Sequence, residues 1–144
     1  MATLTDAQTE TLVNAAIDAR SRAYAPYSNF ATGAAVLTSS GAVHAGAMVE
    51  NLVFGLAMCA ERVALFSAIT AREGMPVAIA VVAPRTAGQR TFPCGPCLQV
   101  AVEVAGPQMA VLAIDAADAS YEVSTIRDLA PGIPHRRTPG ANLL

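Results

Sequence analysis

The chain has 144 residues, of which 53% are hydrophobic and 14% are charged, and its formal net charge is −2. This length fits one domain that can bury a core without disulfide staples. A slightly acidic chain lacks the basic surface that binds nucleic acid, no apolar run is long enough to span a bilayer, and the first residues predict no secretory signal. The apolar composition predicts that some surface is buried between subunits. We expect one domain over residues 1–130 and an irregular tail over 131–144, where prolines and glycines cluster.

The first half of the chain predicts a helix, a β-hairpin and a second helix. Apolar residues between Leu12 and Ala19 recur at helical spacing, and Pro26 opens an aromatic loop that ends at Phe30. Gly41 supplies the glycine that a hairpin turn favours. The predicted elements are a helix over 5–22, strands over 31–37 and 42–48, a connection over 49–57 and a helix over 59–72.

The second half alternates strands with helices. Residues 75–83 (MPVAIAVVA) form a continuous β-branched run, which is typical of a central strand that is covered on both faces. Ser124 is the expected cap of the last helix. The predicted elements are a strand over 75–83, a loop over 84–92, a helix over 95–104, a strand over 108–114, an edge strand over 119–123 and a helix over 124–129. This order predicts an α/β fold, namely a three-layer α/β/α sandwich around a mixed sheet.

All three cysteines lie in two short stretches, Met58-Cys59-Ala60-Glu61-Arg62 and Pro93-Cys94-Gly95-Pro96-Cys97. Their number and context do not indicate a disulfide framework, and we expect a reduced, cytoplasmic protein with a metal site. Both stretches fall at predicted helix starts, where free N–H groups and the helix dipole stabilise thiolates. Three thiolates would bind one Zn²⁺ per chain. Because neither histidine has ligand-like spacing, we expect an open fourth position, which is typical of catalytic zinc.

Glu61 is the candidate catalytic residue. It lies two residues after Cys59, so its carboxylate can reach water at the open position and carry a proton to a ring nitrogen and to a departing amine. Arg62 would compensate the negative formal charge of three thiolates around one zinc. The alternative is an exposed helix carboxylate that pairs with Arg62 or Arg72.

In order and spacing, several segments resemble the small cytidine deaminases with a three-cysteine zinc site, and the resemblance covers most of the chain. The matching segments are 23–30 (AYAPYSNF), 33–35 (GAA), 49–51 (VEN), 55–56 (GL), 59–62 (CAER), 93–97 (PCGPC), Gln99 and 129–131 (LAP). The resemblance implies a five-stranded α/β/α fold and hydrolytic deamination of cytidine and deoxycytidine to uridine and deoxyuridine with release of ammonia. It also implies a place in pyrimidine salvage and a homotetramer with active sites near the subunit contacts.

The resemblance also implies a role for each residue of the site. Cys59, Cys94 and Cys97 become the zinc ligands and Glu61 the proton shuttle, with Arg62 beside the thiolates. The implied substrate-binding residues are Phe30 stacking on the base, Glu50 at a ribose hydroxyl, Ala60 with its backbone N–H at the pyrimidine carbonyl, and Met48 and Asn51 beside them.

Some positions depart from the family pattern. The departures are Met48 where the family has an asparagine that shares the ribose contact, Leu52-Val53-Phe54 where it has Ala-Ser-Tyr, Leu98 where it has an arginine, and no aromatic counterpart at Ile133 or Pro134. These changes leave the cysteines and Glu61 intact, but an apolar side chain at a sugar contact disfavours a hydroxylated ligand.

Three further hypotheses therefore stay open beside cytidine deamination. One is a deaminase with a changed substrate, such as a nucleoside of the blasticidin S type or a free aminated base. Another, from a different class, is a non-enzymatic zinc-stabilised binding module. The last is a redox role for the Cys94–Cys97 pair.

Overall fold

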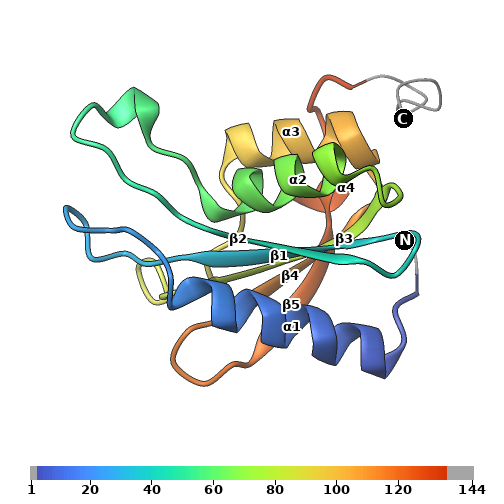
Figure 1. Ribbon diagram of the computed structural model, residues 1–144, viewed down its shortest axis with the longest axis horizontal. Coiled ribbons are helices and arrows are strands. Elements are labelled where there is room, and N and C mark those ends of the chain that lie inside the picture. The colour runs from blue at the N-terminus through green and yellow to red at the C-terminus, as the bar shows by residue number, and fades with distance from the viewer. Residues whose placement is uncertain (1–2, 136–144) are drawn as a thin grey trace.

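The computed structural model describes residues 3–135 and arranges them in three layers, with a sheet between α1 on one face and α2, α3 and α4 on the other (Figure 1). The helices are α1 (Asp6–Arg20), α2 (Ala60–Ala71), α3 (Gly95–Ala105) and α4 (Ile126–Leu129), with a 3-10 helix η1 (Phe54–Leu56). The strands are β1 (Gly33–Thr38), β2 (Val43–Ala47), β3 (Pro76–Ala83), β4 (Ala110–Asp115) and β5 (Tyr121–Thr125). The predicted α/β/α sandwich is confirmed.

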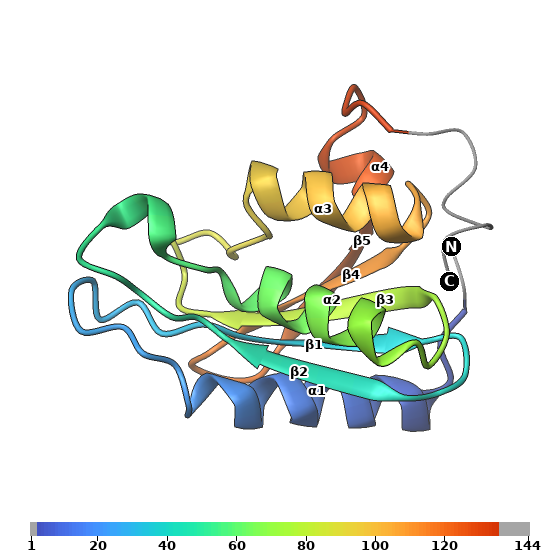
Figure 2. The same ribbon diagram turned by 45° about the horizontal axis from the view of Figure 1, so that its top comes forward.

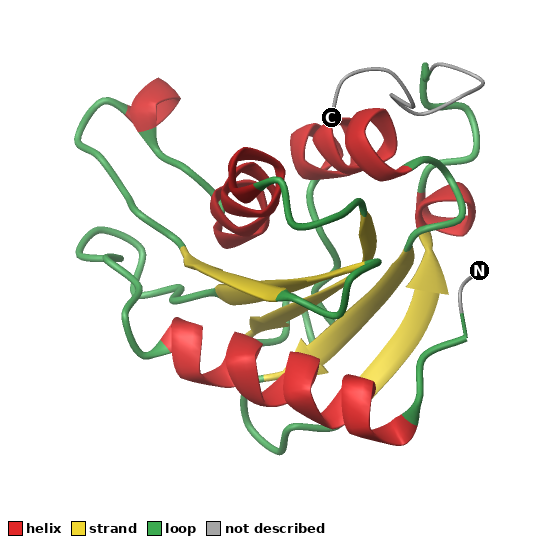
Figure 3. Ribbon diagram, turned by 45° about the vertical axis from the view of Figure 1, so that its right-hand side comes forward, coloured by secondary structure: helices red, strands yellow, loops and turns green. Residues whose placement is uncertain are grey.

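The sheet is mixed and has the strand order β2-β1-β3-β4-β5. Strands β3 and β4 are parallel, and the other neighbours are antiparallel. A parallel pair needs a crossover connection, which here contains α3. In Figure 3 the single helix α1 lies across one face of the twisted sheet, and the other helices lie across the opposite face. Helices α2 and α3 share a face and contact each other, which allows their first turns to approach.

Each face of the sheet carries its own hydrophobic core because side chains alternate along a strand. Ala34 and Val36 of β1 point into the core under α2, α3 and α4, whereas Ala35 and Leu37 point toward α1. Both faces of β1, β3 and β4 are therefore covered, which the continuous apolar run of β3 predicts for that strand.

Two glycines allow the helices to pack closely on the sheet. A Cβ on Gly46 of β2 would lie 2.5 Å from the Ala64 nitrogen and 2.7 Å from the Ala60 carbonyl oxygen, both in α2. A Cβ on Gly33 of β1 would lie 2.3 Å from the Arg20 nitrogen in α1. Since real Cβ atoms do not come this close to backbone, any side chain at Gly46 would displace the helix that follows Cys59.

Several element boundaries differ from the sequence prediction. Ser124 does not cap α4, because β5 stays paired with β4 as far as Thr125 and Ser124 is a strand residue opposite Val111. The hydroxyl of Thr125 caps α4 instead, accepting from the Asp128 N–H at 3.2 Å. The connection after β2 contains η1, which the sequence did not predict.

The first helix begins at a reciprocal capping box formed by Thr5 and Gln8. Residues 136–144 of the predicted tail lie outside the described residues. Among residues 3–135, the helices are too short or too polar to cross a membrane.

Candidate active site

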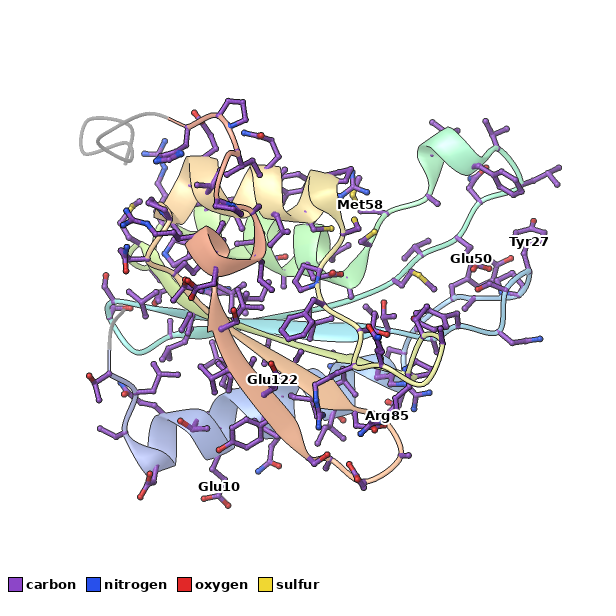
Figure 4. The ribbon with its side chains drawn as sticks, turned by 180° about the vertical axis from the view of Figure 1, so that it is seen from behind. Glu10, Tyr27, Glu50, Met58, Arg85 and Glu122 are labelled. Atoms are coloured by element: carbon purple, nitrogen blue, oxygen red, sulfur yellow. The ribbon has the colours of Figure 1, made fainter. Side chains whose placement is uncertain are left out.

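Two helix starts bring the three thiols together. Cys59 is the N-cap residue of α2, Cys94 is the N-cap residue of α3, and Cys97 lies in the first turn of α3. The Sγ atoms of Cys59 and Cys94 are 3.9 Å apart, those of Cys94 and Cys97 are 3.4 Å apart, and all three lie within 4.8 Å of one another. In Figure 4, Met58 marks the chain immediately before this cluster.

The separations fit a tetrahedral zinc ion. Zinc binds a thiolate at about 2.3 Å, and two ligands at the tetrahedral angle are then about 3.8 Å apart. The separations of 3.9 and 3.4 Å lie close to that value. A set of three thiolates also favours zinc over the hard cations, which prefer oxygen ligands. The donor set and its spacing therefore suit one zinc ion with a fourth position left for another ligand.

The thiols do not ionise alike. A hydrogen bond from the Cys97 thiol, together with those from Arg62 and Cys94, lowers the pKa of Cys59 to about 5. The pKa of Cys97 is raised, because its thiol faces the Cys59 thiolate and is buried. The first negative charge of the cluster therefore forms on Cys59, at the positive end of α2.

Glu61 is the second residue of α2, and its side chain is only 6% exposed. Burial raises the pKa of its carboxyl to about 7, and the nearby Cys59 charge adds to this shift. A carboxyl group that titrates near neutral pH can both accept and donate a proton at working pH. The alternative of an exposed helix carboxylate is wrong, since solvent barely reaches this group.

Arg62 places a positive charge beside the thiols. Its Nη2 donates to Cys59 Sγ at 3.6 Å. Its Nε is buried and has no hydrogen-bond partner within residues 3–135. The predicted position of Arg62 next to the cluster matches this geometry.

The residues expected on the substrate side lie on two neighbouring segments. Figure 2 shows the loop between α1 and β1 beside the connection that leads from β2 to α2, both at one end of the sheet. Glu50 and Tyr27 lie close to each other there, one on each segment (Figure 4). These segments enclose a hollow of about 390 Å³, lined by Tyr27, Ser28, Glu50, Asn51, Phe54 and Ala57.

Glu50 and Phe30 are both held in this region by Ser28. The carboxylate of Glu50 accepts from the Tyr27 and Ser28 backbone N–H groups at 2.9 and 3.3 Å and from the Ser28 hydroxyl. The same hydroxyl accepts from the Phe30 N–H at 3.0 Å. The sequence analysis missed Ser28, although a serine two residues before the aromatic residue of a tight loop is a common side-chain-to-backbone acceptor.

The remaining residues singled out in the sequence differ in their surroundings. Met48 is half-buried and packs against the core that contains Ala60. The Oδ1 of Asn51 accepts from the Val53 N–H at 2.9 Å, which shapes its own turn. Ala60 is the first residue of α2, so its N–H has no acceptor within the helix. Leu98 is 7% exposed and lies in the core between the sheet and the helices on this face.

The histidines are occupied elsewhere. His44 of β2 has its Nε2 3.0 Å from Glu73 Oε2. His135 has its Nδ1 3.0 Å from the Ile133 carbonyl oxygen. The geometry thus agrees with an all-thiol metal cluster.

Comparisons with known proteins agree with this site. The family model for the cytidine and deoxycytidylate deaminase zinc-binding region matches residues 1–89. The cytidine deaminase of Halalkalibacterium halodurans is 41% identical over 121 residues, which cover 84% of this chain and 89% of the relative. The probable cytidine deaminase of Dictyostelium discoideum is 40% identical over 95 residues, covering 65% of this chain and 63% of the relative.

Solved structures agree as well. The crystal structure of cytidine deaminase from Burkholderia pseudomallei has a TM-score of 0.80 at 42% identity and covers 91% of this chain and 100% of that chain. The cytidine deaminase from Mycobacterium tuberculosis has a TM-score of 0.71 at 33% identity and covers 90% and 98%, respectively. The sequence, the fold and the thiol cluster lead to one conclusion: this chain belongs to the cytidine deaminase family of zinc-dependent deaminases.

Proposed function

We propose that the protein catalyses the hydrolytic deamination of cytosine nucleosides, converting cytidine and deoxycytidine to uridine and deoxyuridine with release of ammonia. One observation carries the proposal: a buried carboxyl group, Glu61, follows the first of three thiols that lie within 4.8 Å of one another. The names of the relatives, which are cytidine deaminases, support the same substrate class.

Cys59, Cys94 and Cys97 would hold one zinc ion, and Arg62 would offset the excess negative charge. Bound there, zinc would supply a Lewis acid that makes water nucleophilic at neutral pH. Glu61 takes a proton from the attacking water and passes it to N3 of the pyrimidine. The water oxygen bonds to C4 as a hydroxyl group, and Glu61 then takes the proton of that hydroxyl and delivers it to the amine. The C4–N4 bond breaks as the C4 carbonyl forms, so that ammonia leaves and the uracil base remains.

The substrate-side residues orient the base and the sugar. The ring of Phe30 offers a flat apolar face to the pyrimidine, and the Ala60 N–H donates to the carbonyl at C2. Three donors already bind Glu50. An ionised carboxylate has about four acceptor positions, so Glu50 keeps room for a sugar hydroxyl.

A second candidate is a deaminase of the same chemistry with another substrate. It is favoured by the side chain of Met48, which packs against the core and cannot replace an amide that binds a hydroxyl. Phe54, which lines the hollow, is also 84% exposed, and Leu52 on the same connection is 77% exposed, so this side of the hollow is apolar. Blasticidin S and free cytosine represent the nucleoside and base classes that such a site would favour.

Ammonia release under steady-state conditions tests both candidates. We expect kcat/KM for cytidine or deoxycytidine of about 10⁴ M⁻¹s⁻¹ or more, which is ordinary for an enzyme on its own substrate. Blasticidin S and cytosine are run in parallel at the same zinc-loaded enzyme concentration. A higher kcat/KM for either one favours the second candidate, and no ammonia from any of the four compounds would falsify the deaminase proposal.

The exposed apolar side chains support a homotetramer. Leu56 is 68% exposed in η1, and Phe66 is 44% exposed on the outer side of α2. Such groups are ordinarily covered in an oligomer. Sedimentation equilibrium should give about four times the chain mass of 14.7 kDa; a monomer at the assay concentration contradicts this proposal.

The three free cysteines support a cytoplasmic location, because a reducing compartment keeps thiols available for a metal. Together with the proposed reaction, this location supports a role in pyrimidine salvage. Subcellular fractionation with an antibody against the chain checks the location, and recovery of the protein in an extracytoplasmic fraction contradicts it.

A further inference from the structure

The loop over residues 21–32, which carries Phe30, is tied to the neighbouring connection through its backbone. The Tyr24 N–H donates to the Met48 carbonyl at 2.8 Å, and the Glu50 N–H donates to the Tyr24 carbonyl at 2.8 Å. These two bonds form a short β-bridge between Tyr24 and Val49. They fix the start of the loop but act six residues before Phe30.

The far end of the loop is fixed by a different set of bonds. The Arg20 Nε donates to the Ala31 carbonyl at 2.9 Å, and the Met48 N–H donates to the Thr32 carbonyl at 3.1 Å. The tip between the two ends, residues 27–29, makes no such backbone pair with the connection. It is held by the side chain of Glu50.

Ser28 lies at the centre of this attachment. Its hydroxyl uses its one proton to donate to Glu50 and uses a lone pair to accept from the Phe30 N–H at 3.0 Å. Asn29, between the two, has φ of 55°, in the left-handed region that asparagine adopts more readily than most non-glycine residues, and its N–H donates to the Ala25 carbonyl at 3.1 Å. The bond from Ser28 to the Phe30 amide therefore spans a left-handed turn.

The effect of Ser28 reaches Glu50 as well. The Ser28 hydroxyl is the largest of the influences that hold the pKa of the Glu50 carboxyl below its usual range. A carboxylate with three fixed donors has little rotational freedom, so its remaining acceptor position points in one direction. One hydroxyl thus connects the two side chains expected to contact base and sugar.

We propose that Ser28 is a positioning residue that sets the Phe30 ring and the Glu50 carboxylate in a common geometry for the nucleoside. The inference rests on the proposed function, in which Phe30 and Glu50 contact the substrate. Ser28 takes no part in proton transfer, and it acts through two hydrogen bonds that require a hydroxyl group. Threonine keeps that hydroxyl at this exposed position, whereas alanine removes both bonds.

The test compares Ser28→Ala and Ser28→Thr with the unmodified, zinc-loaded enzyme. We expect Ser28→Ala to lower kcat/KM for cytidine about 10-fold, mostly through KM, because binding groups lose alignment while Glu61 and the thiols are untouched. Ser28→Thr should restore most of the loss. In the substrate-free protein, NMR should show faster hydrogen exchange at the Phe30 amide in Ser28→Ala, since that N–H loses its acceptor.

Ser40→Ala is the matched control, because Ser40, in the turn after β1, also uses its hydroxyl in a side-chain-to-backbone bond, to the carbonyl of Glu73 after α2. It should leave KM and Phe30 exchange unchanged. Unchanged KM and unchanged Phe30 exchange in Ser28→Ala overturn the inference, as does a Ser28→Thr variant that is as impaired as Ser28→Ala. If the unmodified enzyme releases no ammonia, the proposed function fails, and the exchange rate alone still decides whether Ser28 holds Phe30.

Discussion

Replacing Glu61 with glutamine should lower kcat for cytidine deamination by about 10²–10⁴-fold while the protein keeps its zinc and its fold. Glutamine has nearly the same shape but can neither take the proton from water nor deliver it to the amine. The side chain is 6% exposed, so a neutral amide is accommodated there without the expense of burying a charge. Ammonia release gives kcat, elemental analysis gives zinc per chain, and a melting curve reports the fold.

Glu10→Gln controls for the chemical change itself. Glu10 is exposed on α1, on the opposite face of the sheet from the thiols, and its replacement should leave all three measurements unchanged (Figure 4). If Glu61→Gln retains full kcat, Glu61 is not the proton shuttle. A non-enzymatic zinc module predicts instead that neither the unmodified protein nor Glu61→Gln releases ammonia, while zinc content and stability are the same in both.

The thiol cluster could be anticipated from sequence because its geometry is largely local. Cys94 and Cys97 share one helix start, and Cys59 immediately precedes another. Polar residues or a proline beside a helix start allow its position to be predicted from the sequence. A thiol at that position lies near free N–H groups independently of the tertiary structure. Only the meeting of α2 and α3 required the tertiary structure.

The attachment of Ser28 to Glu50 could not be anticipated in the same way. The two residues are 22 positions apart and meet only because Tyr24 pairs with the segment after β2. The role of Gly46 was hidden for a similar reason, since nothing in the sequence of β2 indicates how closely α2 will approach. Ser124 was predicted to cap the last helix because serine is a good capping residue. That prediction is wrong, because strand pairing with β4 keeps Ser124 in β5.

The family resemblance placed Met48 and Leu98 at sites of substrate or charge contact. In the structure, Met48 is half-buried and packs against the hydrophobic core, and Leu98 lies within that core. An apolar residue in a motif position is free to turn inward, because no hydrogen bond holds it toward the ligand. The departures from the family pattern are therefore absorbed partly by packing, and the sugar side is the part of the site where sequence alone is least informative.

Replacing Cys97 with alanine should remove both zinc and activity. Cys97 is 1% exposed, and it lies within 4.8 Å of the other two thiols, so no solvent ligand replaces it without disturbing the core. Two thiolates bind zinc far more weakly than three, and without the ion water remains a poor nucleophile at neutral pH. We expect well under one zinc per chain and a fall in ammonia release of more than about 10³-fold. The melting temperature should also fall, because an ion that binds only the folded state stabilises it.

Val102→Ala separates loss of the metal from loss of packing. Val102 lies on the same helix and is equally buried at 1% exposure, and its truncation should reduce stability by about 1–3 kcal/mol without releasing zinc. Two measurements, ammonia release and the zinc content after dialysis, should therefore distinguish the two variants even if their melting temperatures coincide. Unmodified protein treated with a chelator should behave like Cys97→Ala and recover when zinc is added, whereas Cys97→Ala should not recover. A Cys97→Ala protein that still carries one zinc per chain would show that Cys97 is a core residue and that the metal is held by other groups.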